Sequence, residues 1–260
     1  MCTLLFAHAV RPDLPLIVAA NRDEARGRPT APLHRWDDLP VVAGRDHLGG
    51  GTWMGIGRGR WAALTNTREP GQERPRARSR GELVVAAITA PGGAEAALRA
   101  IAARADAYNR FNLVAGDASG LWWLSTFAGE LRMEAVPPGI HGLSNHLLDT
   151  PWPKVQVGKD RLRAIAAAPE GPSVDALLEL LGDRRGFADD VLPDTGVGLE
   201  RERELAPLLI DTPAYGTRSS TALIVDAGGR ATLAELTRDP LAGDRRVDLR
   251  LALDDLAADP

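Results

Sequence analysis

The sequence predicts an α+β protein, arranged as a four-layer αββα sandwich of two mainly antiparallel sheets. The order of its expected elements favours this class: strands, two helices, strands, two or more helices, and strands again. Glycines between neighbouring apolar runs suit tight turns that need a positive φ. With 260 residues, 44% of them hydrophobic, the chain is large enough for one domain with a sizeable core.

The first strands are recognised as apolar runs of strand length. Residues 3–10 and 14–20 are separated by the turn-forming sequence Arg11-Pro12-Asp13, so we expect a buried hairpin. The polar residues Asn21-Arg22-Asp23-Glu24 follow directly, and residues 25–40, with their prolines and arginines, are expected to form a loop. Three more short strands are expected, at 41–44, 49–57 and 60–66.

The spacing of alanine and leucine predicts helices over residues 81–89 and 94–108. A further helix is expected over 154–168, beginning near Trp152-Pro153 because proline suits a first helical turn. Another is expected over 173–181, with Ser173 as N-cap and Gly182 at its end.

The remaining strands are expected on both sides of this second pair of helices. Those at 111–117, 120–125, 130–136 and 139–145 form one meander, and 219–226 pairs with 230–236 across Gly228-Gly229. The charged residues after Thr237 are weakly periodic. We therefore treat 237–260 as a peripheral segment of a single domain over 1–260.

The composition argues against several classes of function. A formal net charge of −4 disfavours nucleic-acid binding. No apolar run is long enough to span a bilayer, so no membrane insertion is expected. The N-terminal apolar run lacks a basic region before it and is expected to be a strand, not a signal peptide. The single cysteine leaves no internal disulfide, which is compatible with a cytoplasmic location.

Cys2 is the residue around which the functional hypotheses are built. It directly follows Met1, and removal of Met1 would leave a thiol and a free α-amine on the same Cα. An α-amine has a reference pKa of about 7.7–8.0, so it can act as the base for its own thiol. The alternative is that Cys2 is a small hydrophobe packed at the start of a strand, which is the common role of a lone cysteine.

Polar residues at three expected strand ends are candidates to assist Cys2. Cys2 and Asn21 lie almost equally far from the hairpin turn, so a paired hairpin brings the end of the second strand, with the Asp23 carboxylate, towards the Cys2 amine. Asn66 and Asn145 end two other strands, and an amide there can donate a hydrogen bond to an oxyanion without adding charge. Arg218 begins a late strand and can contact a substrate carbonyl or carboxylate. Each of these residues can equally cap a turn or lie on the surface.

Three other patterns carry less functional information. The glycines at 49–59 are not followed by the Gly-Lys-Ser/Thr of a Walker loop and suit turns. The five histidines lack the spacing of a compact metal site, so no metal is expected, although His8 and His146 remain candidates for a haem pocket. The basic run 74–80 suits a solvated loop, with an anion-attracting lid as the alternative.

Several motifs in this order resemble the NRDE family, the group that contains the Transport and Golgi Organisation 2 proteins. They extend from Met1 to about Leu236 and comprise Cys2-Thr3-Leu4, Asn21-Arg22-Asp23-Glu24, Gly50-Gly51-Thr52-Trp53, Thr65-Asn66, Gly142-Leu143-Ser144-Asn145, Pro151-Trp152-Pro153-Lys154-Val155 and Gly216-Thr217-Arg218-Ser219-Ser220. The resemblance implies an N-terminal nucleophile hydrolase fold. Within that fold the nearest chemistry looks like that of cysteine acylases, which cleave linear amide bonds.

Carried over by this resemblance, Cys2 matches the acylase nucleophile, and Asp23 matches the aspartate near its amine. Asn66 and Asn145 look like the two asparagines that border the oxyanion site. Those acylases place an arginine three residues before the aspartate, where this chain has Ala20. Arg22 and Arg218 are the two candidates for the missing cation and therefore for substrate binding.

Two hypotheses follow. In the first, the protein is a cytoplasmic amidohydrolase or acyltransferase that needs no cofactor and acts on a small amide or acyl substrate through Cys2. In the second, it is a non-catalytic carrier that uses the same pocket for haem or a lipid or acyl-CoA ligand, since the resembled family is associated with haem trafficking and lipid homeostasis.

Overall fold

The computed structural model describes residues 2–239 and 243–256. Its contacts divide the chain into two compact units. The first unit comprises Met1–Gly27, Arg68–Gly71 and Pro138–Arg250, and the second comprises Arg28–Thr67, Gln72–Pro137 and Leu251–Pro260. The expectation that Met1 is removed concerns a residue outside the described ones. No helix in the described ranges is both long enough and apolar enough to cross a membrane.

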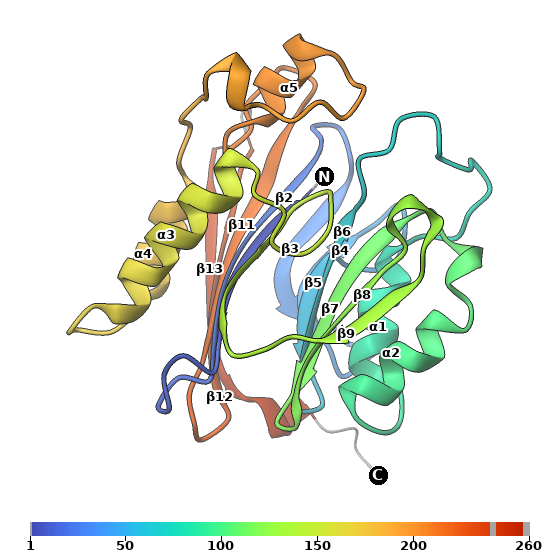
Figure 1. Ribbon diagram of the computed structural model, residues 1–260. Helices are drawn as coiled ribbons and strands as arrows, with labels where there is room; N and C mark the ends of the chain where they lie inside the picture. Colours follow the sequence, from blue (N-terminus) through green and yellow to red (C-terminus); the bar gives the residue numbers. More distant parts are fainter. Residues whose placement is uncertain (1, 240–242, 257–260) are drawn as a thin grey trace. The chain divides into compact units, whose positions relative to one another are not determined.

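The first unit is built on a six-stranded sheet in the order β10-β1-β2-β11-β12-β13 (Figure 1). β1 (Cys2–His8) and β2 (Leu16–Ala25) form the predicted antiparallel hairpin. β10 flanks β1 on its other side, and β11 flanks β2. The remaining strands are β10 (Gly139–Leu143), β11 (Tyr215–Val225), β12 (Arg230–Thr237) and β13 (Arg245–Ala252).

Helices α3 (Pro153–Ala167) and α4 (Val174–Leu181) cover one face of this sheet. α3 packs on β1 and β10. Gly158 permits a close approach there, because a Cβ built on it would lie 2.6 Å from Leu5 Cδ1. α5 (Leu199–Leu205) also belongs to this unit.

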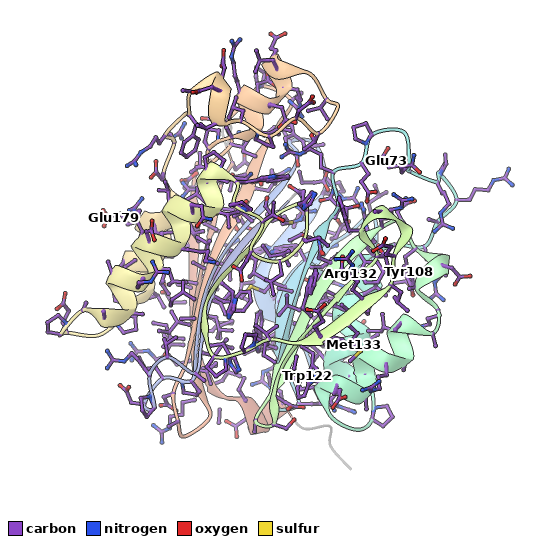
Figure 2. The ribbon with its side chains drawn as sticks, viewed as in Figure 1. Glu73, Tyr108, Trp122, Arg132, Met133 and Glu179 are labelled. Carbon is purple, nitrogen blue, oxygen red and sulfur yellow. The ribbon has the colours of Figure 1, made fainter. Side chains whose placement is uncertain are left out.

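Helix α4 has the amphipathic pattern expected from its sequence. Ser173 Oγ accepts the backbone N–H of Ala176 at 3.1 Å, as predicted for an N-cap. Leu177 and Leu181 lie in the buried core against the sheet, whereas Glu179 is exposed on the outer side of the helix (Figure 2). Burial of this leucine stripe therefore fixes which face of α4 meets the sheet.

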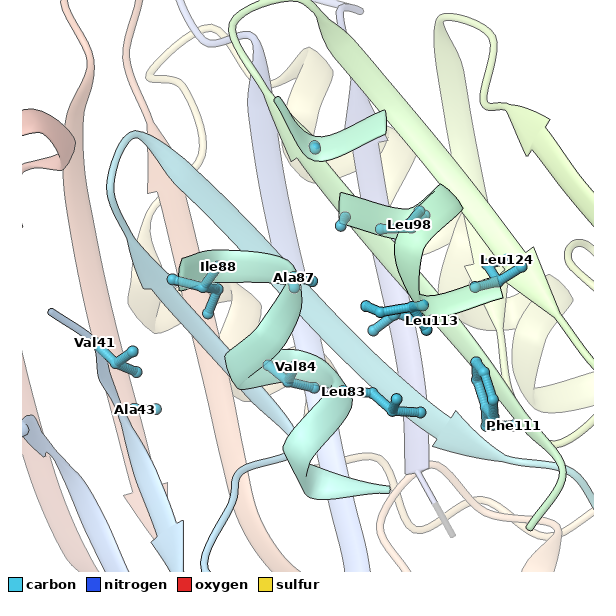
Figure 3. Close-up of a cluster of buried hydrophobic side chains, with 14 of the residues drawn as sticks. Val41, Ala43, Leu83, Val84, Ala87, Ile88, Leu98, Phe111, Leu113 and Leu124 are labelled. Carbon is cyan, nitrogen blue, oxygen red and sulfur yellow. The ribbon is translucent and has the colours of Figure 1, made fainter. Parts of the chain in front are cut away.

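The second unit is built on a seven-stranded sheet in the order β3-β4-β5-β6-β7-β8-β9, and among the described residues its neighbouring strands pair antiparallel. The strands are β3 (Thr30–Arg35), β4 (Val42–Asp46), β5 (Met54–Gly57), β6 (Arg60–Asn66), β7 (Phe111–Asp117), β8 (Gly120–Ser125) and β9 (Arg132–Ala135). Helices α1 (Gly81–Thr89) and α2 (Ala94–Ala102) pack on it. Figure 3 shows the resulting core, in which Leu83 and Ile88 of α1 and Leu98 of α2 meet Leu113 and Leu124 of the sheet.

Short 3-10 turns complete the described structure, at Ala105–Ala107, Phe127–Gly129, Asp189–Val191 and Leu253–Leu256. The expectation of an α+β chain with two mainly antiparallel sheets and outer helices is confirmed. Whether the chain acts as the single domain expected over 1–260 stays a prediction.

Several local expectations were wrong. Residues expected as loop contain the edge strand β3, which tolerates Pro32 because an edge strand does not need every N–H in its ladder. β10 does not continue the meander of β7–β9 but pairs with β1 in the other sheet. The second expected helix ends at Ala102, followed by a 3-10 turn. β13 and α5 were not anticipated.

Candidate active site

The hairpin register places Cys2 directly opposite Arg22. Directly paired residues of an antiparallel ladder project from the same face, so the thiol and the Arg22 side chain share one face of the sheet. The next strand continues this row, because Arg22 pairs with Ser219 of β11. Of the two arginines proposed to serve the site, Arg22 is thus the one in register with Cys2.

Cys2 is a free cysteine that is neither fully buried nor fully exposed. Burial raises the pKa of its thiol, and the negative charge of Asp23 acts in the same direction. The positive charge of Arg22 and a hydrogen bond from the Asp23 backbone lower that pKa. Cys2 is therefore a mainly neutral thiol that needs a base before it can attack an electrophile.

Asp23 lies one residue further along β2, and its side chain is buried at 1% exposure. Its Oδ1 accepts the hydroxyl of Thr217 at 2.7 Å, and its backbone carbonyl accepts the Tyr215 hydroxyl at 2.9 Å. Burial raises the pKa of this carboxyl, while the positive charge of Lys154 and the bond from Thr217 lower it. β11 therefore holds Asp23 in one orientation at the Cys2 end of the sheet.

A group of buried charges surrounds Asp23. Lys154, in the first turn of α3, is 3% exposed and donates from Nζ to the Leu205 carbonyl at 3.0 Å. Burial lowers the pKa of Lys154 to about 8, and the attraction to the negative charge of Asp23 is the largest effect in the opposite direction. Arg68 Nη1 contacts Glu202 Oε2 at 2.5 Å, and both side chains are buried. A buried carboxylate requires such countercharges, because an isolated ion is costly away from water.

Asn145 lies just beyond β10, on the other side of Cys2 from Arg22. Its side chain is fully buried, and its Oδ1 accepts the Ser144 hydroxyl at 3.2 Å. The same hydroxyl lies 3.3 Å from the Cys2 carbonyl, which is the alternative acceptor for its one proton. The Arg68 backbone N–H donates to the Asn145 carbonyl at 2.8 Å. The end of β10 thus brings Asn145 to the start of β1, and its expected contribution to an oxyanion site stays a prediction.

Arg218 occupies an irregular position in β11. The pairing with β2 shifts between Thr217 and Ser219, which leaves Arg218 as the extra residue of a bulge. Its Nη1 donates to the carbonyls of Ala25 and Arg26. This arrangement gives Arg218 a role in binding the backbone at the end of β2. The substrate-binding role expected for it stays a prediction.

Asn66 belongs to the second unit, where it ends β6 opposite Phe111. It is partly exposed, and its Nδ2 approaches the Thr67 carbonyl at 3.5 Å. Its expected contribution to an oxyanion site stays a prediction.

The two histidines proposed for a haem pocket stand apart on the first unit. His8 ends β1, so it lies at the opposite end of that strand from Cys2, roughly 20 Å away at about 3.3 Å per residue. His146 follows Asn145, and its Nδ1 is 2.8 Å from Thr150 Oγ1. Burial lowers the pKa of both imidazoles. The structure does not bring His8 to the Cys2 end of the sheet.

The basic run 74–80 is held by the second unit instead of extending freely. Arg74 donates to the Tyr108 carbonyl, Arg78 pairs with Glu82, and Arg80 donates to the Arg110 carbonyl. Arg78 also borders a hollow of about 300 Å³ with Tyr108. None of the predicted site residues lines this hollow.

Sequence reasoning missed the charged groups behind Asp23. Lys154 lies inside the motif Pro151-Trp152-Pro153-Lys154-Val155, but no role was expected for it, and none was expected for Arg68 or Glu202. A lysine in the first turn of a helix normally lies in water, so nothing local reveals the burial of Lys154. The observation that only two lysines occur in the sequence, Lys154 and Lys159, was the one available signal.

Comparison with solved structures identifies the fold class. The chain is similar to the Caenorhabditis elegans N-acylethanolamine-hydrolyzing acid amidase ortholog, with a TM-score of 0.50 and 11% sequence identity. The match covers 85% of this chain and 92% of that one. At this identity the likeness concerns the fold alone, and that fold is the N-terminal nucleophile hydrolase fold.

The family is shown by sequence. The chain belongs to the Transport and Golgi organisation 2 family, whose model matches residues 1–240. It is 35% identical to the Transport and Golgi organization 2 homolog of Mus musculus and 37% identical to the homolog of Bos taurus. Each alignment covers 90% of this chain and 92% of the relative. The Drosophila melanogaster protein of the same name is 29% identical, with coverage of 91% and 92%.

Proposed function

We propose that this protein is a cysteine N-terminal nucleophile amidohydrolase or acyltransferase acting on a linear amide or acyl substrate. The observation that carries the proposal is the environment of Cys2, which lies in register with buried Arg22 at the strand end where Asp23 and Asn145 are also held. The fold class and the family membership support it. The proposal places the protein in the cytoplasm and requires no cofactor.

The chemistry begins with removal of Met1, which frees the Cys2 α-amine. The amine takes the thiol proton, and the thiolate attacks the substrate carbonyl, so a C–S bond forms. Asn145 donates to the resulting oxyanion, and Asn66 is its expected second donor. As the C–N bond breaks, the Cys2 ammonium returns the proton to the leaving amine. A water molecule then attacks the thioester, a C–O bond forms, and the C–S bond breaks to release the acid.

Three charged residues have distinct roles in this proposal. Asp23 orients the Cys2 amine and stabilises its protonated form. Arg22 favours the thiolate, since its positive charge acts against the burial that raises the thiol pKa. Lys154 offsets part of the cost of keeping Asp23 ionised away from water.

Labelling with an electrophilic acyl probe tests the proposal. The wild-type protein should be acylated at Cys2, and Cys2→Ala should not be labelled. Intact-mass analysis of the native protein should show that Met1 is absent. If Met1 is retained, or if a broad panel of acyl probes gives no Cys2-dependent labelling, the catalytic proposal fails.

One observation favours the second candidate function, a non-catalytic carrier of haem or a lipid or acyl-CoA ligand. The cysteine acylases that the chain resembles have an arginine three residues before the aspartate, and this chain has Ala20 there. Titration with haem, followed at the Soret band, tests the haem version. A spectral shift that disappears in His146→Ala supports it, and an unchanged spectrum in the wild type removes it.

A further inference from the structure

The loop between β10 and α3 closes back on the strand that it leaves. The backbone N–H of Asp149 donates to the Gly142 carbonyl at 2.8 Å. In return, the backbone N–H of Gly142 donates to Asp149 Oδ1 at 2.9 Å. Residues 143–148 are enclosed by this reciprocal pair, and they include Ser144 and Asn145. The position of Asn145 therefore depends on how firmly the base of the loop is closed.

Two further side chains converge on the Asp149 carboxylate. His141 Nδ1 lies 2.7 Å from Oδ2, and Lys159 Nζ donates to Oδ1 at 2.6 Å. These partners come from β10 and α3, so the carboxylate joins the strand and the helix at the two ends of the loop. Burial alone would raise the pKa of Asp149. The hydrogen bonds from His141, Lys159 and Gly142 outweigh this effect and lower the pKa to about 2. Asp149 is consequently ionised near neutral pH.

The backbone of Asp149 indicates that its position is imposed by these contacts. Its φ is +59°, in the left-handed region that is costly for residues other than glycine. Aspartate is among the residues that tolerate this region best, and its carboxylate is used in full here. A residue in such a conformation persists where the surrounding structure holds it.

The enclosed loop reaches Cys2 through Ser144 and Asn145. Ser144 Oγ lies 3.3 Å from the Cys2 carbonyl and 3.2 Å from Asn145 Oδ1, and its one hydroxyl proton is shared between these two acceptors. The amide oxygen of Asn145 is an acceptor here, and its NH₂ is the donor group of the side chain. A shift of the loop would move that amide relative to Cys2.

We propose that Asp149 is a positioning residue, whose carboxylate clamps the base of loop 143–148 and so holds the Asn145 amide where an oxyanion forms at Cys2. The inference rests on the proposed function. It assigns a task to a residue that does not itself touch the substrate. The oxyanion requires a donor placed within a few tenths of an ångström, so a loosened clamp reduces acyl transfer before it affects folding.

The test compares two reactions of the same Cys2 thiol in the full-length protein. Acylation by p-nitrophenyl acetate passes through an oxyanion, whereas alkylation by iodoacetamide is a direct displacement and does not. Asp149→Ala and Asp149→Gly should slow Cys2 acylation about tenfold or more and leave alkylation within about twofold of wild type. Asp149→Gly also removes the backbone strain, so its result is independent of any loss of folding in Asp149→Ala.

Two further variants serve as references for the acylation rate, one conservative and one as a control. Asp149→Asn keeps an acceptor for the Gly142 N–H and should recover part of the acylation rate. Asp160→Ala is the matched control, because within the described residues this exposed carboxylate on α3 forms its ion pair with Arg163, at 2.6 Å, and not with the loop. It should acylate like the wild type.

The outcomes separate the two proposals. If Asn145→Ala slows acylation but Asp149→Gly behaves like Asp160→Ala, the clamp is overturned and the proposed function stands. A parallel fall in acylation and alkylation in the Asp149 variants also overturns the clamp, since it indicates a merely structural role. If the wild type shows no Cys2-dependent acylation, or Asn145→Ala has the wild-type rate, the oxyanion role in the proposed function fails first.

Discussion

At the scale of single residues, the register of the β1–β2 hairpin decides which charged side chain lies on the same face of the sheet as the Cys2 thiol. Neighbouring strand residues project to opposite faces, so Cys2 can share its face with Arg22 or with Asp23 but not with both. The structure pairs Cys2 with Arg22 and leaves Asp23 to Thr217 and the buried charges. Arg22, one residue before the aspartate, is therefore the candidate arginine that lies on the same face as the thiol, and its role as the cation of the acylase resemblance stays a proposal.

Lys154 provides the sharpest residue-scale prediction. Burial raises the pKa of Asp23, and the positive charge of Lys154 is the largest effect that lowers it. Lys154→Met should therefore raise the Asp23 pKa further, and the acid limb of Cys2 acylation should move to higher pH. A shift of one unit corresponds to about tenfold in rate on that limb. The measurement is the pH profile of Cys2 acylation.

The control for this experiment is Gln156→Met, on an exposed position of the same helix. Its acid limb should coincide with that of the wild type. An unshifted limb in Lys154→Met would show that Asp23 ionisation does not govern acylation.

At the scale of elements, local sequence signals predicted most helices and hairpins, but they did not predict which strands that are distant in the sequence pair with each other. Helix Gly81–Thr89 and the hairpin of Phe111–Asp117 with Gly120–Ser125 occur with the expected bounds, because periodicity and turn residues specify them locally. The transfer of β10 to the sheet of β1 depends on contacts between residues far apart in the chain. No local pattern encodes such a partner.

The candidate site divides in the same way. Cys2, Asp23 and Asn145 could be found because they occupy strand ends and recognisable motifs. Arg22 was a candidate, but its face follows only from the register of the folded hairpin. Asp149 lies between the motifs at 142–145 and 151–155 and belongs to neither. Its function as a clamp follows from three donors that fold around it.

The contact between α3 and β1 gives an element-scale prediction. A Cβ at Gly158 would lie 2.6 Å from Leu5 Cδ1, and Leu5 is fully buried with little room to move. Gly158→Ala should therefore lower the free energy of unfolding by about 1–3 kcal/mol, despite the better helix propensity of alanine. Denaturant unfolding followed by far-UV circular dichroism measures this.

Gly186→Ala serves as the comparison, since a Cβ at Gly186 meets nothing within 4 Å. It should change the unfolding free energy by less than about 0.5 kcal/mol. Equal stability of the two variants would mean that α3 does not press on β1 as closely as described.

At the scale of the whole molecule, fold and family are shown, and the activity rests on particular side chains. The likeness to the amidase ortholog at 11% identity establishes the fold alone. The Transport and Golgi organisation 2 relatives match over nine-tenths of their length, but their names state no reaction. The proposal of an acyl-transfer enzyme thus depends on Cys2 and the groups held around it.

The central claim is that Cys2 is a processed N-terminal nucleophile. Mass spectrometry of the N-terminal peptide, after treatment of the natively produced protein with an acyl probe, tests it directly. The account predicts a peptide that begins at Cys2 and carries the acyl mass on its sulfur. A peptide that still begins with Met1, or a processed Cys2 that remains unmodified while the probe acylates a free-cysteine standard, would contradict it.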